Sequence, residues 1–312
     1  MIRVKGHRSF SKKEYIKQFW KKREFDPENI FWNLKKKIVN LFSGITYFVY
    51  EIVSSPFIYI KLFKIRGIKK NKEVLIIAGG PSSNRLNVKD LEKFQKKNDI
   101  FFINYFCINK KFKKIIPNYQ VISDPNSLKL KKNIMLNSRR QLERIQNLKK
   151  FISSNKNLKV FTPIKYAKEL SAIINHNRIF GFCDSDLSYI YNFTVPILPR
   201  GYLSSTSFKA IAIASWMGYK KQYIIGLDHN YINNLRTGSN NEIFQIETHS
   251  YEKNILNDFT DCFGDLSDYV YNEYRLLYHL KRLTINKEIY NLDNYSYTPG
   301  LKKIKSKKFK LK

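Results

Sequence analysis

The feature that most constrains the fold is an apolar run, Val74-Leu75-Ile76-Ile77-Ala78, which stops abruptly at Gly79-Gly80-Pro81-Ser82. Consecutive large aliphatic residues are typical of a parallel strand that is covered on both faces. Glycines at its end let a ligand approach the backbone, and helix-forming residues follow at Val88 to Gln95. A strand, a glycine turn and a helix N-terminus together form an anion site. The run therefore predicts a phosphate-binding turn. The alternative is a turn that binds nothing, since the spaced glycines of the dinucleotide fingerprint are absent.

Strand-like and helix-like runs alternate from Glu73 onward. Strands are expected at Val74–Ala78, Ile100–Asn104, Tyr119–Ser123, Lys159–Thr162, Arg178–Phe182, Gln222–Gly226 and Glu288–Asn291. Helices are expected at Lys89–Lys96, Ser138–Ser153, Lys165–Ile174, Ser205–Met217 and Leu266–Arg282. This order predicts an α/β fold with a Rossmann-like, mostly parallel sheet that carries helices on both faces.

The charge of the chain is extreme. Its 312 residues include 57 Lys and Arg against 25 Asp and Glu, which gives a formal net charge of +32. Such a surface prefers polyanions: nucleic acid, anionic lipid or acidic glycan. Basic residues concentrate at 11–37 and 301–312, so we divide the chain into a basic, aromatic helical extension (1–70), a Rossmann-like domain (71–300) and a basic tail (301–312).

The N-terminal extension interleaves basic and aromatic residues, among them Phe19-Trp20-Lys21 and Phe31-Trp32, and precedes an apolar stretch from Ile38 to Ile60. Polar residues interrupt this stretch, whereas a membrane-spanning helix needs about 20 predominantly apolar residues. We expect a helix pair lying on an anionic membrane surface. The alternatives are a spanning helix and a helical hairpin packed on the domain itself.

Cysteine usage and the first residues bear on localisation. Cys107, Cys183 and Cys262 match neither a zinc pattern nor a disulfide framework, and no signal peptide is visible. We expect a protein at the cytoplasmic face of the inner membrane, held there peripherally or monotopically.

Polar residues follow several of the expected strands. Asn104 and Asp124 follow the second and third strands, and Asp228 follows the strand that ends at Gly226. Ligands of such sheets bind outside the carboxyl ends of the strands, where Asn and Asp side chains can hydrogen-bond a ribose or a base. Each is also an ordinary turn former or helix cap. The hydroxyls of Ser205, Thr206 and Ser207 precede an alanine-rich helix; one caps it, and the run is long enough to bind an anion as well.

His229 and His249 are the acid–base candidates, because imidazole titrates near neutral pH. Both lie in a polar segment at about 229–264 that we expect to close over a ligand as a lid. His7, His176 and His279 are treated as structural. No metal site is expected; the single Asp-x-Asp triplet, Asp184-Ser185-Asp186, follows a late strand and precedes an aromatic stretch.

Taken together, these motifs resemble the bacterial sialyltransferases of glycosyltransferase family 42. They resemble still more closely the pterin diphosphokinase-like proteins of surface-polysaccharide gene clusters, in which a Gly-x-Asp-His-x-aromatic element precedes a downstream His. The resemblance covers about residues 73 to 300 and is most specific from Thr206 to Tyr231. It implies a variant of the GT-A fold and an inverting, metal-independent transfer of an acidic sugar from a CMP-activated donor to a lipid-linked or other surface glycan.

The resemblance also implies roles for individual residues. The glycine turn, Gly79-Gly80-Pro81-Ser82, would lie against the phosphate and ribose of the nucleotide, with Asn104 and Asp124 near the sugar and base. Thr206 and Ser207 would contact the carboxylate of the sugar or the nucleotide. His249 would deprotonate the acceptor hydroxyl. The phenols of Tyr231 and Tyr251 would stabilise the departing phosphate, and no metal or other cofactor would be required.

Two other functions stay open at this stage. A pterin diphosphokinase would need ATP and Mg²⁺, and its carboxylates would have to come from Asp124, Asp184, Asp186 and Asp228. A non-enzymatic nucleic-acid-binding protein would account for the charge and would bind with a steep salt dependence. No recognisable nucleic-acid module is present, and the basic residues accompany interfacial aromatic residues.

Overall fold

The computed structural model describes residues 30–124, 139–184, 195–199, 205–229, 232–239, 243–251, 255–258, 266–284, 287–296, 298 and 301–304. Within these ranges the main element is an eight-stranded sheet in which every neighbouring pair runs parallel. Its order is β11-β10-β6-β1-β2-β3-β4-β5. The strands are β1 (Glu73–Ile77), β2 (Asp99–Ile103), β3 (Tyr119–Val121), β4 (Lys159–Pro163), β5 (Ile179–Phe182), β6 (Lys221–Ile225), β10 (Glu288–Asn291) and β11 (Lys302–Lys303).

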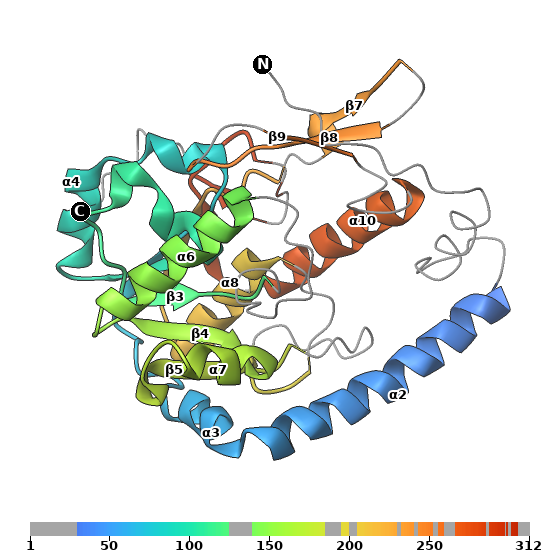
Figure 1. The fold of residues 1–312 in the computed structure, drawn as a ribbon, viewed down its shortest axis with the longest axis horizontal. Coiled ribbons are helices and arrows are strands. Elements are labelled where there is room, and N and C mark those ends of the chain that lie inside the picture. The colour runs from blue at the N-terminus through green and yellow to red at the C-terminus, as the bar shows by residue number, and fades with distance from the viewer. Residues whose placement is uncertain are drawn as a thin grey trace.

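Helices cover both faces of this sheet, as the sequence predicted (Figure 1). They are α4 (Val88–Gln95), α6 (Arg139–Ser154), α7 (Ile164–Ser171), α8 (Thr206–Met217) and α10 (Leu266–Leu283). Alternate residues of β1 enter two separate apolar cores: Val74 and Ile76 pack with α8 and α10, whereas Leu75 and Ile77 pack with α4 and α6. A strand buried on both faces needs apolar residues throughout, which explains its uninterrupted run.

The expected elements agree with the structure to within a few residues at each end. β1, β2 and β6 each begin and end one residue earlier than expected, and α7 ends at Ser171 rather than Ile174. A second sheet was not expected: β7 (Leu235–Thr237), β8 (Ile243–Glu247) and β9 (Ile255–Asp258) form an antiparallel sheet in the segment predicted to be a lid. These strands were not predicted because they are short and lie among polar and glycine residues.

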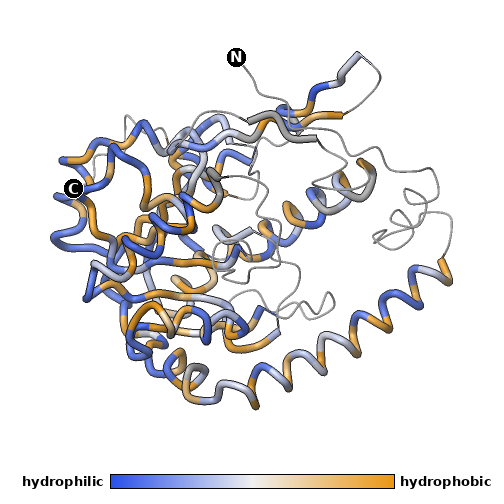
Figure 2. The backbone as a smooth tube through the Cα atoms, viewed as in Figure 1, coloured by the Kyte–Doolittle hydropathy of each residue, from blue (hydrophilic) through white to orange (hydrophobic). Residues whose placement is uncertain are grey.

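Two helices precede the sheet, α2 (Ile30–Ser54) and α3 (Pro56–Lys64). α3 packs Tyr59 and Leu62 into the core, and the indole of Trp216 donates a 2.8 Å hydrogen bond to the Leu62 carbonyl. α2 extends from α3 along the outside of the molecule (Figure 1), and its backbone alternates between apolar and polar residues along its length (Figure 2). In the part of the chain that the structure describes, no helix combines the length and apolarity needed to cross a membrane.

Candidate functional site at the carboxyl edge of the sheet

A cavity of about 650 Å³ opens at the carboxyl ends of β1, β2, β3 and β6. From β1 the chain builds the sheet outward through β2 to β5, and β6 then adds on the other side of β1. The β1/β6 boundary is therefore the point where the strand order reverses, which is where doubly wound sheets bind their ligands. Gly79 and Gly80 follow β1 at this point, and Asp228 and His229 follow β6.

The glycine turn does not present its amides to the cavity in the way the sequence suggested. Gly80 N donates to Gly226 O at 2.9 Å, Ser83 N to Gly80 O at 3.1 Å, and Ser82 N to Asp228 Oδ2 at 3.1 Å. A short 3₁₀ helix, Pro81–Arg85, separates the turn from α4, whose own N-terminus is capped by the Asn87 side chain. Two N–H groups of the turn, those of Gly80 and Ser82, therefore already have partners within the chain, which leaves fewer amides for a phosphate than the sequence pattern implied.

Ser82 and Asp228 were predicted to contact ligand, but they bind each other. The Ser82 hydroxyl donates to Asp228 Oδ1 and accepts a 3.0 Å hydrogen bond from Gly226 N, which ties the ends of β1 and β6 together. Burial raises the pKa of the Asp228 carboxyl; the hydrogen bonds from Ser82 oppose this shift and the neighbouring Asp293 adds to it. Asp228 still lines the cavity, whereas Ser82 is buried behind it.

Asn104 and Thr206 meet in a hydrogen-bonded network at the ends of β2, β3 and α8. Asn104 adopts a positive φ of 45°, and its Nδ2 donates to Thr206 Oγ1 at 3.0 Å. Ser123 joins both residues: its N donates to Asn104 Oδ1 at 3.3 Å, and its Oγ lies 2.7 Å from Thr206 Oγ1. These contacts occupy the Thr206 hydroxyl and fix where α8 begins at the cavity. Asp124, predicted from the same strand end, also lines the cavity.

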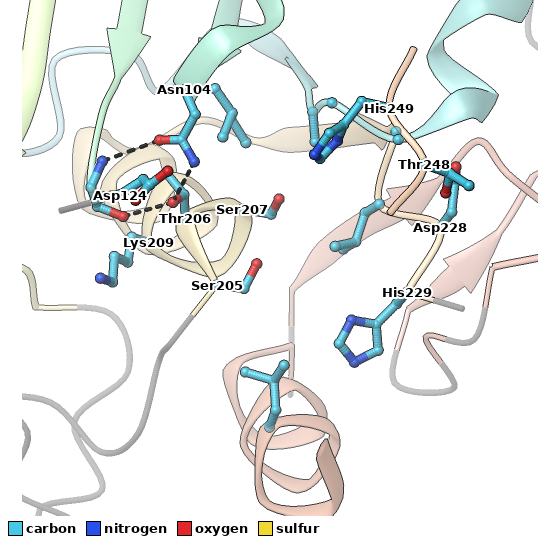
Figure 3. A pocket seen from close by; sticks show the side chains of 18 of the residues that line it. Asn104, Asp124, Ser205, Thr206, Ser207, Lys209, Asp228, His229, Thr248 and His249 are labelled. Atoms are coloured by element: carbon cyan, nitrogen blue, oxygen red, sulfur yellow. Dashed lines mark hydrogen bonds between the residues drawn. The ribbon is translucent and has the colours of Figure 1, made fainter. Parts of the chain in front are cut away.

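The N-terminus of α8 faces the cavity and carries a buried cation. The hydroxyls of Ser205 and Ser207 point toward its open centre (Figure 3). In the first turns of the same helix Lys209 is buried, and its Nζ lies 2.6 Å from Asp184 Oδ1. Lys165 approaches Asp184 Oδ2 at 3.4 Å from α7. Burial lowers the pKa of Lys165, but the Asp184 carboxylate, together with Tyr166 and Tyr47, raises it more, and the net direction is upward, so Lys165 is charged at neutral pH.

His249 lies across the cavity from these hydroxyls (Figure 3). It follows β8, and its ring stacks on Tyr251 with centroids 4.9 Å apart and an interplanar angle of 10°. Between the two residues, Ser250 N donates to Gly79 O at 2.7 Å, and its carbonyl accepts from Asn84 and Asn109. The middle of the predicted lid is thus bonded to the glycine turn, and this bond places His249 at the cavity.

His229 is held differently. It has a positive φ of 50°, its side chain is almost fully buried, and Nε2 lies 3.0 Å from Glu273 Oε2 of α10. A carboxylate at this position can hold the imidazole in one orientation, as in carboxylate–histidine pairs of enzymes. His229 lines the cavity but points away from His249 (Figure 3). The two histidines therefore occupy separate positions.

The structure brings most of the predicted site residues to one cavity. Those that line it are Gly79, Gly80, Pro81, Asn104, Asp124, Ser205, Thr206, Ser207, Asp228, His229 and His249. Tyr231 lies outside the described residues, as does Asp186. Among the described residues, no group of three or more His, Cys, Asp or Glu side chains is placed to hold a metal ion. Asp184, the first carboxylate of the Asp-x-Asp triplet, pairs with two lysines.

Three charged residues that line the cavity were not singled out from the sequence: Lys165, Lys209 and Glu273. Lys209 left a signal that could have been used, since it is the single charged residue in the apolar run from Phe208 to Met217. A lysine at such a position needs a partner or a ligand. Lys165 and Glu273 gave no such signal, because charged residues are ordinary on partly exposed helices.

Comparisons with protein-family models and with curated protein sequences find no match. Among solved structures, the chain is similar to the MAf glycosyltransferase from Magnetospirillum magneticum AMB-1, with a TM-score of 0.46 and 11% sequence identity. The similarity covers 78% of this chain and 35% of that one, so this chain spans about a third of the length of that protein. The cavity and its side chains therefore carry the functional inference.

Proposed function

We propose that this protein is an inverting glycosyltransferase that transfers an acidic sugar from a CMP-activated donor to a hydroxyl group of a surface glycan, without a metal ion. The observation that carries the proposal is the placement of His249 opposite the α8 N-terminus in one cavity at the strand-order reversal (Figure 3). Backbone N–H groups and the helix dipole favour negative charge at one wall. An imidazole that can accept a proton stands at the other.

The donor is placed from the charges of the cavity. We assign its phosphate or carboxylate to Ser205, Ser207 and the first turn of α8, rather than to the glycine turn, whose amides are largely bonded within the chain. The nucleoside then lies toward Asn104 and Asp124. This arrangement differs from the assignment made from sequence, in which Gly79 to Ser82 held the phosphate.

The proposed reaction is a single displacement. The acceptor hydroxyl oxygen attacks the anomeric carbon, and His249 takes the hydroxyl proton. The bond between the anomeric carbon and the phosphate oxygen breaks, and CMP leaves with the electron pair. Because the leaving group departs on the face opposite the base, we assign the departing phosphate to the α8 N-terminus rather than to the Tyr251 phenol, whose ring stacks beside His249.

A thermal-shift screen with CMP, UMP, GDP and ATP, each with and without Mg²⁺, tests the nucleotide. A ligand that binds only the native state adds about 2.7 kcal/mol of stability at a hundredfold excess over its dissociation constant. We expect CMP to raise Tm without Mg²⁺. Stabilisation by ATP that depends on Mg²⁺, with no response to CMP, would contradict the proposal and favour the diphosphokinase alternative.

CMP release from CMP-activated nonulosonic acids, in the presence of a lipid-linked glycan acceptor, tests the chemistry. We expect His249→Gln to lower kcat by about 10²- to 10⁴-fold, the usual contribution of general acid–base catalysis. His176→Gln is the matched control, because His176 lies outside the cavity and contacts Lys61. Equal rates for the two variants would remove His249 from the mechanism.

A further inference from the structure

α2 exposes the face that an ordinary surface helix would bury. Ile38, Phe42, Ile45, Val49 and Val53 are spaced by three or four residues and therefore share one side of the helix. Phe42 is 66%, Val49 53% and Val53 75% exposed. We call these five residues the α2 stripe. By contrast, the residues of α2 that are buried are Gly44 and Glu51.

α3 continues the exposed apolar surface. Phe57 is 75% and Ile60 49% exposed, whereas Tyr59 and Leu62 on the other side of the helix belong to the core. The Trp216–Leu62 hydrogen bond and the core contacts hold α3 on the domain. The exposed side is therefore presented in a defined direction.

The charges beside the α2 stripe are of one sign. Lys35, Lys36 and Lys37 lie at its start, and Glu51 is the single acid between residues 30 and 72, where it is 1% exposed. Lys36 Nζ lies 4.7 Å from the centroid of the Trp32 ring, which joins a cation to an interfacial aromatic side chain. A second copy packed in parallel would bring the same cations against each other, whereas anionic headgroups complement them, so the charge pattern favours an anionic partner.

We propose that α2 and the exposed side of α3 form a docking surface for a lipid bilayer that contains anionic lipid. The α2 stripe enters the boundary between headgroups and acyl chains, and the lysines contact the headgroups. A helix with one wide apolar side and cationic flanks is the form that binds in the plane of a membrane. This surface is independent of the cavity, so it stands whether or not the proposed reaction is correct.

Sedimentation of the full-length chain with vesicles tests the surface. One set of vesicles contains phosphatidylcholine alone, and the other contains phosphatidylcholine mixed with phosphatidylglycerol. We expect binding to the anionic vesicles to weaken about tenfold or more when Phe42, Val49 and Val53 are replaced by Ser. Lys35, Lys36 and Lys37 replaced by Gln should weaken it roughly a hundredfold and leave little preference for anionic lipid.

The matched control replaces two apolar residues exposed elsewhere, Ile116→Ser and Leu142→Ser, and should bind like the wild type. Circular dichroism and Tm confirm that each variant is folded; the substituted positions are exposed, so folding is retained. Equal vesicle binding by the stripe variant and the control overturns the proposal. A concentration-dependent dimer that the stripe variant abolishes would also overturn it. So would displacement of the chain from both kinds of vesicle by RNA, if the stripe variant bound vesicles and RNA as the wild type does.

Discussion

Gly79 and Gly80 are adjacent in the chain, but their surroundings give them different tasks. A Cβ atom on Gly80 would lie 2.5 Å from Gly226 O and 2.6 Å from Asp228 Oδ2, both fixed by the junction between β1 and β6. A Cβ atom on Gly79 would instead meet Tyr251 Cε1 at 3.0 Å and His249 Nδ1 at 3.5 Å. Gly79 thus lets the segment that carries His249 approach, and Gly80 lets the ends of β1 and β6 meet.

Gly80→Ala should therefore destabilise the fold. Backbone and a hydrogen-bonded carboxylate cannot move aside cheaply, so we expect a loss of about 2 kcal/mol or more in the free energy of unfolding. Urea denaturation measures it. Gly79→Ala is the comparison: its neighbours are side chains, so it should cost less stability and act mainly on turnover through His249. A larger stability loss for Gly79→Ala than for Gly80→Ala would contradict this assignment.

His279 predicts a pH dependence of stability. Burial, together with Arg275 and Arg282 on the same helix, lowers its pKa to about 4. The His279 imidazole of the unfolded chain, with a pKa of about 6.5, takes up a proton at a higher pH than that of the folded chain. The free energy of unfolding therefore falls as pH drops from about 6.5 to about 4. The loss should reach on the order of 3 kcal/mol at the lower end. Denaturation at several pH values measures it.

The control for this effect is His279→Gln, which places a neutral, non-titrating side chain at the same position of α10. The difference in stability between the two proteins should change across this pH window and stay constant above it. Parallel curves for the two proteins would show that His279 does not cause the dependence.

Among the elements, α8 organises the site, because it is buried along nearly its whole length and both of its ends are held in fixed positions. Its N-terminus is held by Asn104 and Ser123, and Gly218 caps its C-terminus at a φ of 89°. An apolar helix in the core cannot rotate or slide without disturbing its packing. The hydroxyls and Lys209 at its start are therefore presented to the cavity rigidly.

Gly218→Ala tests this cap. A left-handed backbone costs an L-residue about 1–2 kcal/mol, and the added Cβ would lie 3.0 Å from Gly67 Cα, so we expect a loss above that range. Gly67→Ala is matched: Gly67 also has a positive φ, of 68°, but its added Cβ would meet the flexible Lys70 side chain at 3.4 Å. Thermal denaturation should rank Gly218→Ala as the more damaging change. A larger loss of stability for Gly67→Ala would show that the close approach at Gly218 does not set the cost of the substitution.

At the scale of the whole molecule, the net charge of +32 sets a salt dependence. Repulsion among like charges opposes the compact state, and added salt screens it. We expect Tm to rise by a few degrees between low and physiological ionic strength, with sodium chloride and sodium fluoride acting alike if screening is the cause. A Tm that falls with salt would show that surface ion pairs outweigh the repulsion.

The parallel sheet, with its helices on both faces, could be predicted from sequence because long apolar runs report burial directly. The apolar composition and the spacing of apolar residues predict strands such as Val74–Ile77 and helices such as α8. The small antiparallel sheet could not be predicted, because its strands are short and partly polar. The interleaved basic and aromatic residues favoured an outward apolar side for α2, but the periodicity of a helix does not say which face meets the protein, so a hairpin packed on the domain stayed open.

The alternation of strands and helices follows from the sequence, and with it the edge of the sheet at which Asn104, Asp124, Asp228 and His229 gather. This follows because parallel strands present their carboxyl ends together. How those groups pair with one another is visible only in the folded chain. Ser82 is paired with Asp228, Lys209 is buried against Asp184, and the amides of the glycine turn are largely satisfied within the chain. Hydrogen-bond partners distant in sequence depend on side-chain directions that no local pattern encodes, so the pattern did not show that Gly80 serves the junction of β1 and β6.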